Sequence, residues 1–248
     1  MGRGVTVVVV VPVYRNASTL EALVERLAPA LAGRDWRLRL VVDASPDDSA
    51  AVARRLAGRD PRVSVTELGV NVGQHKALER GLDDEGAADA WVCLDADLQD
   101  PPEAVPLLLD RLAAGDVEAV FAGRRGTYST PLRRWTGAAH RAVVGALTGL
   151  PADAGAFLAI TPRARAAVLS ARAPSLVVAI GAARLSVTSV GVQRAPRTVG
   201  GSAWTSRARL GLSLRSLAWL VSAPSAGPRA WWSSRRRTSP PRGRARRR

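Results

Sequence analysis

Short apolar runs alternate with helical patterns through the first 122 residues of this 248-residue chain. The first run, Val5–Val11, is short and rich in Val, which is typical of a parallel strand that is buried on both faces. The runs are Val5–Val11, Leu38–Val42, Val63–Leu68, Ala90–Leu94 and Ala119–Ala122. Between them, apolar residues recur at helical spacing. This order predicts an α/β domain with a mostly parallel central sheet that helices cover.

The expected helices span residues 20–31, 49–56 and 74–82, with a fourth after Pro101. Ser18 and Glu21 have the spacing of a capping box for the first of them. Beyond residue 125 the pattern is less regular. A helix is expected over Pro131–Leu150, and strands are expected over Ala156–Ile160 and Leu185–Val192.

The charge is divided unevenly along the chain. Residues 1–153 carry 18 Lys or Arg and all 21 Asp and Glu, whereas residues 154–248 carry 18 Arg and no acidic residue. The second half therefore favours an anionic partner, and nucleic acid, anionic lipid and phosphorylated substrates all meet that requirement. We predict a domain over 1–206, an amphipathic, membrane-surface helix over 207–228, and an Arg-rich disordered tail over 229–248.

Several classes of protein are excluded by what the chain lacks. A single cysteine, Cys93, excludes an internal disulfide framework and a zinc site built from a cysteine cluster. No apolar run reaches the roughly 18 to 20 residues of a membrane span. The Val7–Val11 run is too short for the apolar region of a signal peptide. We therefore expect a cytoplasmic protein.

The strongest local signal is the sequence Asp95-Ala96-Asp97-Leu98-Gln99, directly after the fourth expected strand. Ligands of such sheets bind beyond the carboxyl ends of the strands. If the chain stays extended here, residues 95, 97 and 99 face one side. Two carboxylates and an amide oxygen form an incomplete oxygen site that suits Mg²⁺ or Mn²⁺. The alternative is a solvated acidic loop.

Four motifs occur in a fixed order: Pro12-Val13-Tyr14, Val42–Asp47, Asn71–Leu78 and Asp95–Glu103. Together they resemble the family 2 glycosyltransferases with a GT-A fold. The sequence DADLQDPPE is most similar to that of polyprenyl-phosphate sugar transferases of the dolichol-phosphate mannose synthase type. The resemblance covers about residues 5–205.

This resemblance implies roles for individual residues on the donor side. Pro12 and Tyr14 would line the nucleotide pocket, and Asp43 would accept a hydrogen bond from the imide N–H of the base. The divalent cation, Mg²⁺ or Mn²⁺, would be held by Asp95, Asp97 and Gln99, with Ala96 in the same donor-binding sequence. Asp43 could instead cap the turn before Asp47, since both readings suit an aspartate at a strand end.

The resemblance also implies residues that contact phosphates. Arg124 would meet the acceptor or donor phosphate, and Arg133 or Arg134 would supply a second arginine, although Arg124 could also be a solvated surface residue. Asp153–Phe157 matches a D-x-G-x-F sequence on the acceptor side. A loop with Arg197 and Ser202 would fold over the donor diphosphate.

The chain departs from the family pattern at several positions. An acidic residue or asparagine is usual where Val42 stands, and glycine is usual where Ala44 stands. Gly137 replaces a serine, and Ala203 replaces a lysine. Many relatives continue into two membrane spans, whereas here only Leu210–Ser222 is apolar, and Arg215 interrupts it.

Two readings of that C-terminal segment stay open. Leu210, Leu214, Leu217 and Val221 share one face of a helix, which suits an interfacial helix with a polybasic extension. The segment also suits a helix that packs on the domain.

The combined prediction is a glycosyltransferase that moves a sugar from a nucleotide-diphosphate sugar to a polyprenyl phosphate at the inner face of the membrane. A phosphate oxygen is already nucleophilic near neutral pH, so a single displacement requires no strong base. A hydroxyl acceptor, as in polysaccharide or secondary-metabolite synthesis, would require a carboxylate base, and Asp153 is the candidate. The alternatives are a catalytically silent homologue and a nucleic-acid-binding protein, which the Arg-rich half would suit but the Asp95–Glu103 sequence disfavours.

Overall fold

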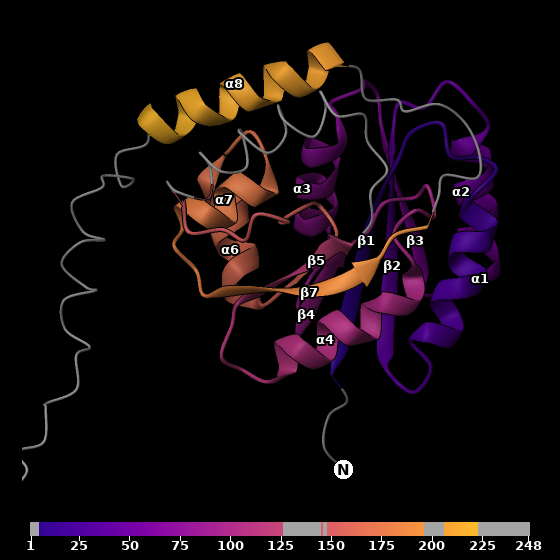
Figure 1. Cartoon of the computed structure of the whole chain (residues 1–248). Coiled ribbons are helices and arrows are strands. Elements are labelled where there is room, and N and C mark those ends of the chain that lie inside the picture. The colour runs from indigo at the N-terminus through magenta and orange to yellow at the C-terminus, as the bar shows by residue number, and fades with distance from the viewer. Residues whose placement is uncertain (1–4, 126–144, 146–147, 196–205, 223–248) are drawn as a thin grey trace, which may run out of the picture.

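The strands of this chain form one seven-stranded sheet in the order β3-β2-β1-β4-β6-β5-β7 (Figure 1). The computed structural model describes residues 5–125, 145, 148–195 and 206–222. The strands are β1 (Thr6–Val13), β2 (Asp35–Asp43), β3 (Val63–Leu68), β4 (Ala90–Cys93), β5 (Ala119–Arg125), β6 (Leu158–Ile160) and β7 (Val187–Gln193). Only β6 runs antiparallel to its neighbours among these strands. The mostly parallel α/β fold predicted from the sequence is confirmed.

Helices cover both faces of the sheet (Figure 1). One face packs against α1 (Leu20–Ala30), α2 (Ser49–Arg59) and α4 (Val105–Ala113), which follows the short 3-10 helix η1 (Pro102–Ala104). The other face packs against α3 (Gln74–Asp84), α6 (Pro162–Ala171) and α7 (Leu176–Ala182). Successive residues of β1 are all buried from Val7 to Val11 because strand side chains alternate between two covered faces.

The ends of several elements differ from the sequence predictions. The capping box at Ser18 and Glu21 is wrong: α1 begins with Thr19 at its N-cap and has no side-chain cap. Thr19 instead donates its hydroxyl to the carbonyl of Ala96, 2.7 Å away, and Glu21 pairs with Arg55 of α2. The side chains of Thr19 and Glu21 thus form tertiary contacts instead of capping the N-terminus of α1.

Two helices after β6 were not predicted. Thr161 caps α6, and Ser175 caps α7, each by accepting a backbone N–H three residues on. Pro162 occupies the first turn of α6. Cap residues followed by proline or an apolar run are a recognisable helix signal, so these helices were within reach of sequence reasoning. Most of the helix expected over Pro131–Leu150 lies outside the described residues.

Helix α3 lies unusually close to the sheet. A Cβ added to Gly81 would come within 2.4 Å of Cγ1 of Val10 and 2.7 Å of Cγ2 of Val41. Glycine is therefore required where the helix crosses β1 and β2. This close contact fixes the position of α3, whose first turn faces the carboxyl ends of the strands.

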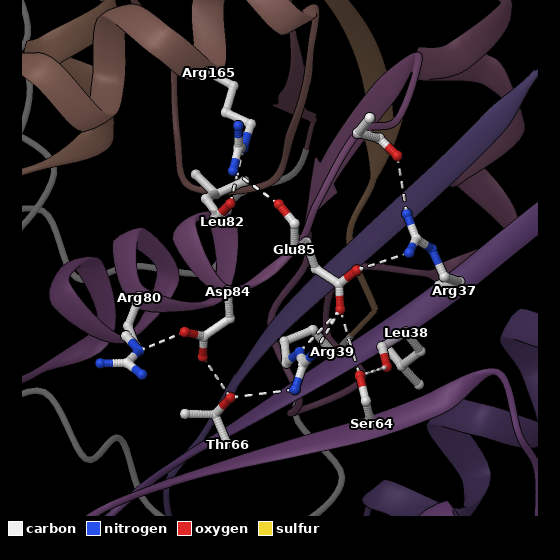
Figure 2. A network of polar contacts seen from close by, with 11 residues as sticks. Arg37, Leu38, Arg39, Ser64, Thr66, Arg80, Leu82, Asp84, Glu85 and Arg165 are labelled. Carbon is white, nitrogen blue, oxygen red and sulfur yellow. Dashed lines mark hydrogen bonds and ion pairs between the residues drawn. The ribbon is translucent and has the colours of Figure 1, made fainter.

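Figure 2 shows a polar network between β2, β3, α3 and α6. The Glu85 side chain is 4% exposed and accepts hydrogen bonds from Arg39 at 2.9 Å and from Ser64 at 3.4 Å. Its backbone carbonyl accepts a hydrogen bond from Arg165 of α6, which also binds the carbonyl of Leu82. The network closes the C-terminal end of α3 against the sheet.

The last described helix, α8 (Ser206–Ser222), lies against α7 on the outside of that layer (Figure 1). It packs through Ser216 and Leu220, which are 2% and 5% exposed. Among the described helices, none alone has the length and hydrophobicity of a membrane span; α6 and α7 reach that threshold only as a pair bent by 104°.

Candidate functional site

The candidate donor-binding residues gather at one edge of the sheet. β1, β2 and β4 run parallel, with Val13 paired to Val42 and Val10 paired to Cys93, so their carboxyl ends are neighbours. Asp43 ends β2, and Asp95 follows β4 by two residues. The fold therefore brings together the two candidate carboxylates that are 52 positions apart in the sequence.

The chain turns sharply after β4 instead of staying extended as predicted. Ala96 and Asp97 form a turn, and Leu98 has a φ of +58°, in the left-handed region. The backbone N–H of Gln99 donates to Oδ1 of Asp97 at 3.1 Å. The chain therefore does not keep the strand alternation that would put residues 95, 97 and 99 on one side, and their assignment as metal ligands stays a prediction.

Asp43 is almost fully buried, with 2% of its surface exposed, and holds the loop that follows β3. Its Oδ1 accepts the backbone N–H of Val72 at 2.7 Å, and its Oδ2 accepts that of Gly73 at 2.8 Å. Asn71 also donates its side-chain amide to the backbone carbonyl of Asp43. The carboxylate thus accepts hydrogen bonds from the backbone of Val72 and Gly73, and its predicted hydrogen bond to a base stays a prediction.

The turn after Asp43 is organised by Asp47, not by Asp43, so the alternative in which Asp43 caps this turn is wrong. Oδ1 of Asp47 accepts the hydroxyls of Ser45 and Ser49, each at 2.6 Å, and Oδ2 accepts the backbone N–H of Ala17 at 3.2 Å. Burial opposes ionisation of this carboxyl, but these hydrogen bonds outweigh it and lower the pKa of Asp47. Asp47 thus joins the loop after β2 to the loop after β1.

Pro12 and Tyr14 lie at the end of β1, between the ends of β2 and β4. Both side chains are partly exposed, as residues that line a pocket must be. The backbone N–H of Tyr14 donates to Oδ1 of Asn16, and the guanidinium of Arg15 lies 5.5 Å from the centre of the Tyr14 ring. Their positions suit the nucleotide contact that the sequence predicted.

Two contacts that sequence reasoning missed hold the turn after β4. The side-chain amide of Gln74, the first residue of α3, donates to Oδ1 of Asp95 at 2.5 Å. The carbonyl of the buried residue Ala96 accepts the Thr19 hydroxyl. Gln74 belongs to the Asn71–Leu78 motif, but nothing in the linear sequence assigns it to Asp95.

The segment after β7 is anchored beside the same turn. Arg194 forms an ion pair with Asp100 at 3.0 Å, and the Asp100 side chain is 3% exposed. The backbone N–H of Ala195 donates to the carbonyl of Gln99 at 2.8 Å. The chain therefore enters residues 196–205, which carry the predicted Arg197 and Ser202, from a point next to the candidate cation site.

Asp153 lies against β5, on the acceptor side of the sequence prediction. A Cβ added to Gly123 would come within 2.0 Å of Oδ2 of Asp153, so glycine allows this approach. The Ser189 hydroxyl of β7 donates to the same oxygen at 3.2 Å. The antiparallel strand β6 explains the placement, because the chain enters β6 from the edge at which β5 ends.

Several predicted residues cannot be placed around this edge. Arg124 belongs to β5 near its carboxyl end, as predicted, but its side chain lies outside the described part of the structure. Arg133, Arg134, Arg197 and Ser202 also lie outside the described residues. Their roles stay predictions.

The donor set at the turn suits a small, hard cation. Asp95 and Asp97 supply carboxylate oxygens and Gln99 supplies an amide oxygen, which is the chemistry that Mg²⁺ and Mn²⁺ prefer. Within the described residues, no three or more His, Cys, Asp or Glu side chains are grouped to hold a metal ion. The chemistry of the two carboxylates and the amide suits a cation that keeps water and substrate oxygens as its other ligands, and their assignment to such a cation stays a prediction.

Sequence comparison adds an independent finding. The family model described as Glycosyl transferase family 2 matches residues 8–160. An undecaprenyl-phosphate 4-deoxy-4-formamido-L-arabinose transferase of Pseudomonas aeruginosa strain LESB58 is 38% identical over 130 residues, which is 51% of this chain and 38% of the relative. The protein of the same name from Pseudomonas fluorescens strain SBW25 is 30% identical over 224 residues, 87% of this chain and 65% of the relative. The chain thus spans less than two thirds of the length of either relative.

Solved structures share the fold. Glucosyl-3-phosphoglycerate synthase from Mycobacterium tuberculosis, in complex with Mn²⁺, uridine diphosphate and glucosyl-3-phosphoglycerate, aligns with a TM-score of 0.64 and 22% identity. The alignment covers 88% of this chain and 80% of that one. The same enzyme with Mn²⁺ and uridine-diphosphate-glucose aligns with a TM-score of 0.63 and 23% identity, over 88% of this chain and 79% of that one. At this identity the likeness establishes a common fold.

Proposed function

Since this chain belongs to glycosyl transferase family 2, we propose that it transfers a sugar from a nucleotide-diphosphate sugar to a polyprenyl phosphate. The observation that carries the proposal is that β2 and β4 end at the same edge of the sheet, which places Asp43 and the turn with Asp95 and Asp97 at that edge, within the segment that matches the family. The similarity to transferases named for undecaprenyl phosphate supports the choice of acceptor.

On the donor side, the proposal assigns the base to the pocket formed by Pro12, Tyr14 and Asp43. Asp95 and Asp97, with Gln99, hold a divalent cation, Mg²⁺ or Mn²⁺. When bound, that cation supplies Lewis-acid stabilisation of the charge on the departing nucleotide diphosphate. Arg124 and Arg133 or Arg134 bind phosphate oxygens, and Arg197 and Ser202 belong to the loop over the diphosphate.

On the acceptor side, the proposal needs no strong base. A phosphate oxygen is ionised near neutral pH and attacks the anomeric carbon directly, while the bond from that carbon to the diphosphate breaks. The chain has to bring the acceptor phosphate and the donor diphosphate together, although both are anions. Arginine side chains suit this task because a guanidinium forms bidentate hydrogen bonds with phosphate. This requirement suits Arg124 near the end of β5 and the arginines that come after this strand in the sequence.

A hydroxyl acceptor is a second candidate because of Asp153. Its carboxylate lies against Gly123 and Ser189, and Gly123 directly precedes Arg124 in β5. A carboxylate at that place could take the proton from an attacking hydroxyl. In this version the product is a glycoside rather than a glycosyl phosphate.

We also propose that the enzyme acts at the cytoplasmic face of a membrane, with α8 lying on an anionic surface. Leu214, Ala218 and Val221 are all exposed on α8 and are spaced by four and three residues. Leu214 and Val221 are 59% and 84% exposed. Such a stripe, beside arginines, suits the boundary between lipid headgroups and acyl chains.

The decisive experiment incubates the chain with undecaprenyl phosphate in detergent, a panel of nucleotide sugars, and Mg²⁺ or Mn²⁺. We expect one donor to yield a glycosyl polyprenyl phosphate that mass spectrometry detects, and a chelator to abolish it. Transfer to a hydroxyl acceptor alone would favour the role of Asp153. Failure of every donor with every acceptor would contradict the proposed activity.

The matching substitution is Asp97→Asn, which removes a charged oxygen ligand while leaving the side chain its size. We expect transfer to fall at least about 100-fold, because the charge on the leaving group is no longer offset. Asp48→Asn is the control, since Asp48 is an exposed carboxylate on a neighbouring loop. Equal rates for Asp97→Asn and the native chain would remove Asp97 from the cation site.

A further inference from the structure

The end of the loop between β3 and α3, with the first residue of α3, contacts two carboxylates that lie at the ends of β2 and β4, two strands that are not neighbours. Val72 and Gly73 donate backbone N–H groups to Asp43 at the end of β2. The next residue, Gln74, donates its side-chain amide to Asp95 beyond β4. Because β1 lies between β2 and β4, these three successive residues bind groups on both sides of the strand that contains Pro12 and is followed by Tyr14.

The base of the Gln74 side chain is held firmly in place. Gly73 forms the N-cap of α3 with a φ of +87°, which a residue with a Cβ rarely adopts, and its carbonyl accepts the N–H groups of Lys76 and Ala77. Further along α3, the close approach of Gly81 to Val10 and Val41 fixes the helix to the sheet. The amide of Gln74 is therefore presented from a rigid support.

A hydrogen bond from this amide restricts how Asp95 can turn. A carboxylate rotates about its χ2 bond between broad minima, and a donor at 2.5 Å from Oδ1 selects one orientation. The amide carries no charge, so it orients the carboxylate without neutralising it. Residues that hydrogen-bond to the ligands of a metal typically tune the affinity of the site.

We infer that Gln74 is a positioning residue, which orients the Asp95 carboxylate for a divalent cation and couples this cation site to the base-side carboxylate of Asp43. The inference rests on the proposed function, because it assumes that Asp95 holds a cation together with a nucleotide diphosphate. It assigns to the Asn71–Gln74 segment a role in donor binding beyond the shape of a strand-to-helix turn.

Substitution Gln74→Met tests the inference, because methionine has nearly the same length and volume but no N–H donor. The comparison is Arg80→Leu, a substitution on the same helix at an exposed side chain whose partner, Asp84, lies away from the strand ends. The measurement is the Kd of Mn²⁺, from the electron paramagnetic resonance signal of free Mn²⁺, with uridine diphosphate and separately with guanosine diphosphate.

With the nucleotide that the native chain binds, we expect the Kd of Mn²⁺ to rise at least about 10-fold in Gln74→Met and to change less than about 2-fold in Arg80→Leu. Transfer by Gln74→Met should recover as Mn²⁺ is raised to saturation, and the thermal unfolding midpoint should stay near that of the native chain. A purely structural role would not produce this recovery.

The possible failures are distinguishable. If the native chain binds Mn²⁺ with neither nucleotide, the proposed function fails and the inference falls with it. If the native chain binds Mn²⁺ and Gln74→Met binds it equally well, the inference alone is wrong. If Gln74→Met loses binding that saturating Mn²⁺ does not restore, and its unfolding midpoint falls, Gln74 supports the fold rather than the cation site.

Discussion

At the scale of single residues, Ala44 stands out because its backbone is in the left-handed region, with a φ of +47°. It directly follows Asp43, at a position where glycine is expected from the sequence resemblance. An alanine in this region is strained by its Cβ, whereas glycine adopts it readily. The strain is stored at the turn that leads from Asp43 to Asp47.

We predict that Ala44→Gly stabilises the fold by about 0.5 to 1 kcal/mol, since relief of the strain exceeds the added entropy of the unfolded chain. Urea unfolding measures the difference. Ala51→Gly is the control, because Ala51 is exposed within α2 and its replacement should destabilise by a similar amount. A loss of stability in both variants would contradict the prediction.

His75, next to Gln74 in the first turn of α3, predicts a pH dependence of stability. Burial, with a smaller contribution from the charge of Lys76, lowers the pKa of His75 to about 4. Its pKa in the unfolded chain is about 6.5. The unfolded chain therefore binds more protons between these values, so stability is fully present above pH 6.5 and is lost as the pH falls toward 4.

We expect the native chain to lose about 2 kcal/mol from this residue between pH 7 and pH 5. Urea unfolding at pH 7, 6 and 5 measures the loss, and His75→Gln should flatten the profile over that interval. His140 is retained in both proteins, so its contribution cancels. Parallel profiles for the native chain and His75→Gln would show that His75 does not titrate in this way.

At the scale of elements, Glu85 holds β2, β3, α3 and α6 together through the network in Figure 2. Its side chain is 4% exposed, and Arg39 beside it is 18% exposed. Removing one member of a buried ion pair leaves the other charge without compensation, which is costlier than losing an exposed pair. We therefore expect this network to contribute more to the stability of the fold than an exposed ion pair does.

We predict that Glu85→Ala destabilises the fold by about 3 to 5 kcal/mol. The matched substitution is Glu67→Ala on β3. The Glu67 side chain is 42% exposed and that of its ion-pair partner Arg54 is 59% exposed, so this pair should contribute about 0 to 1 kcal/mol. Chemical denaturation of both variants gives the comparison. Similar losses in the two variants would contradict the role given to burial.

At the scale of the whole molecule, α8 combines an attached face with an exposed one. The sequence predicted one apolar face with Leu210, Leu214, Leu217 and Val221. In the structure Leu217 packs partly against the core, whereas Leu214 and Val221 are exposed, so these residues do not form a single face. The side chain of Leu210 lies outside the described residues. The attached face bears out the packing helix, and the exposed stripe keeps membrane binding as a proposal. Residues 207–248 carry 12 Arg and no acidic residue, which favours an anionic surface.

We predict that the chain co-sediments with phosphatidylglycerol vesicles and that raised salt weakens this binding. Replacing Leu214 and Val221 together by Gln should reduce binding at least about 10-fold, because each side chain contributes up to about 1.5 to 3 kcal/mol when fully removed from water and tenfold corresponds to about 1.4 kcal/mol. These residues are exposed, so the fold should be unaffected. This design avoids truncation after Ser206, which would uncover the surface that α8 packs on.

The control is Leu107→Gln, since Leu107 is a comparably exposed leucine on α4, on the opposite face of the sheet. We expect its vesicle binding to equal that of the native chain. Absence of binding at low salt would contradict the membrane prediction. Binding to nucleic acid instead of vesicles would support the nucleic-acid alternative.

The sequence by itself determined the alternating strands and helices of the first 122 residues and the identity of the candidate chemistry. The strand Val63–Leu68 has the predicted bounds, and the predicted helix over 74–82 lies within α3. These features depend on periodicity and turn chemistry within a few residues, which the linear sequence contains. The Asp95–Gln99 sequence likewise identified its carboxylates before any fold was known.

Only the tertiary structure decided how these side chains are held. Gln74 and Asp95 are 21 positions apart, Thr19 and Ala96 are 77 apart, and Arg194 and Asp100 are 94 apart. The turn at Leu98 and the contacts of Asp43 also depend on which loops the sheet order brings together. Local patterns cannot encode such pairs, because each side chain finds its partner only after the strands have been ordered and the helices packed.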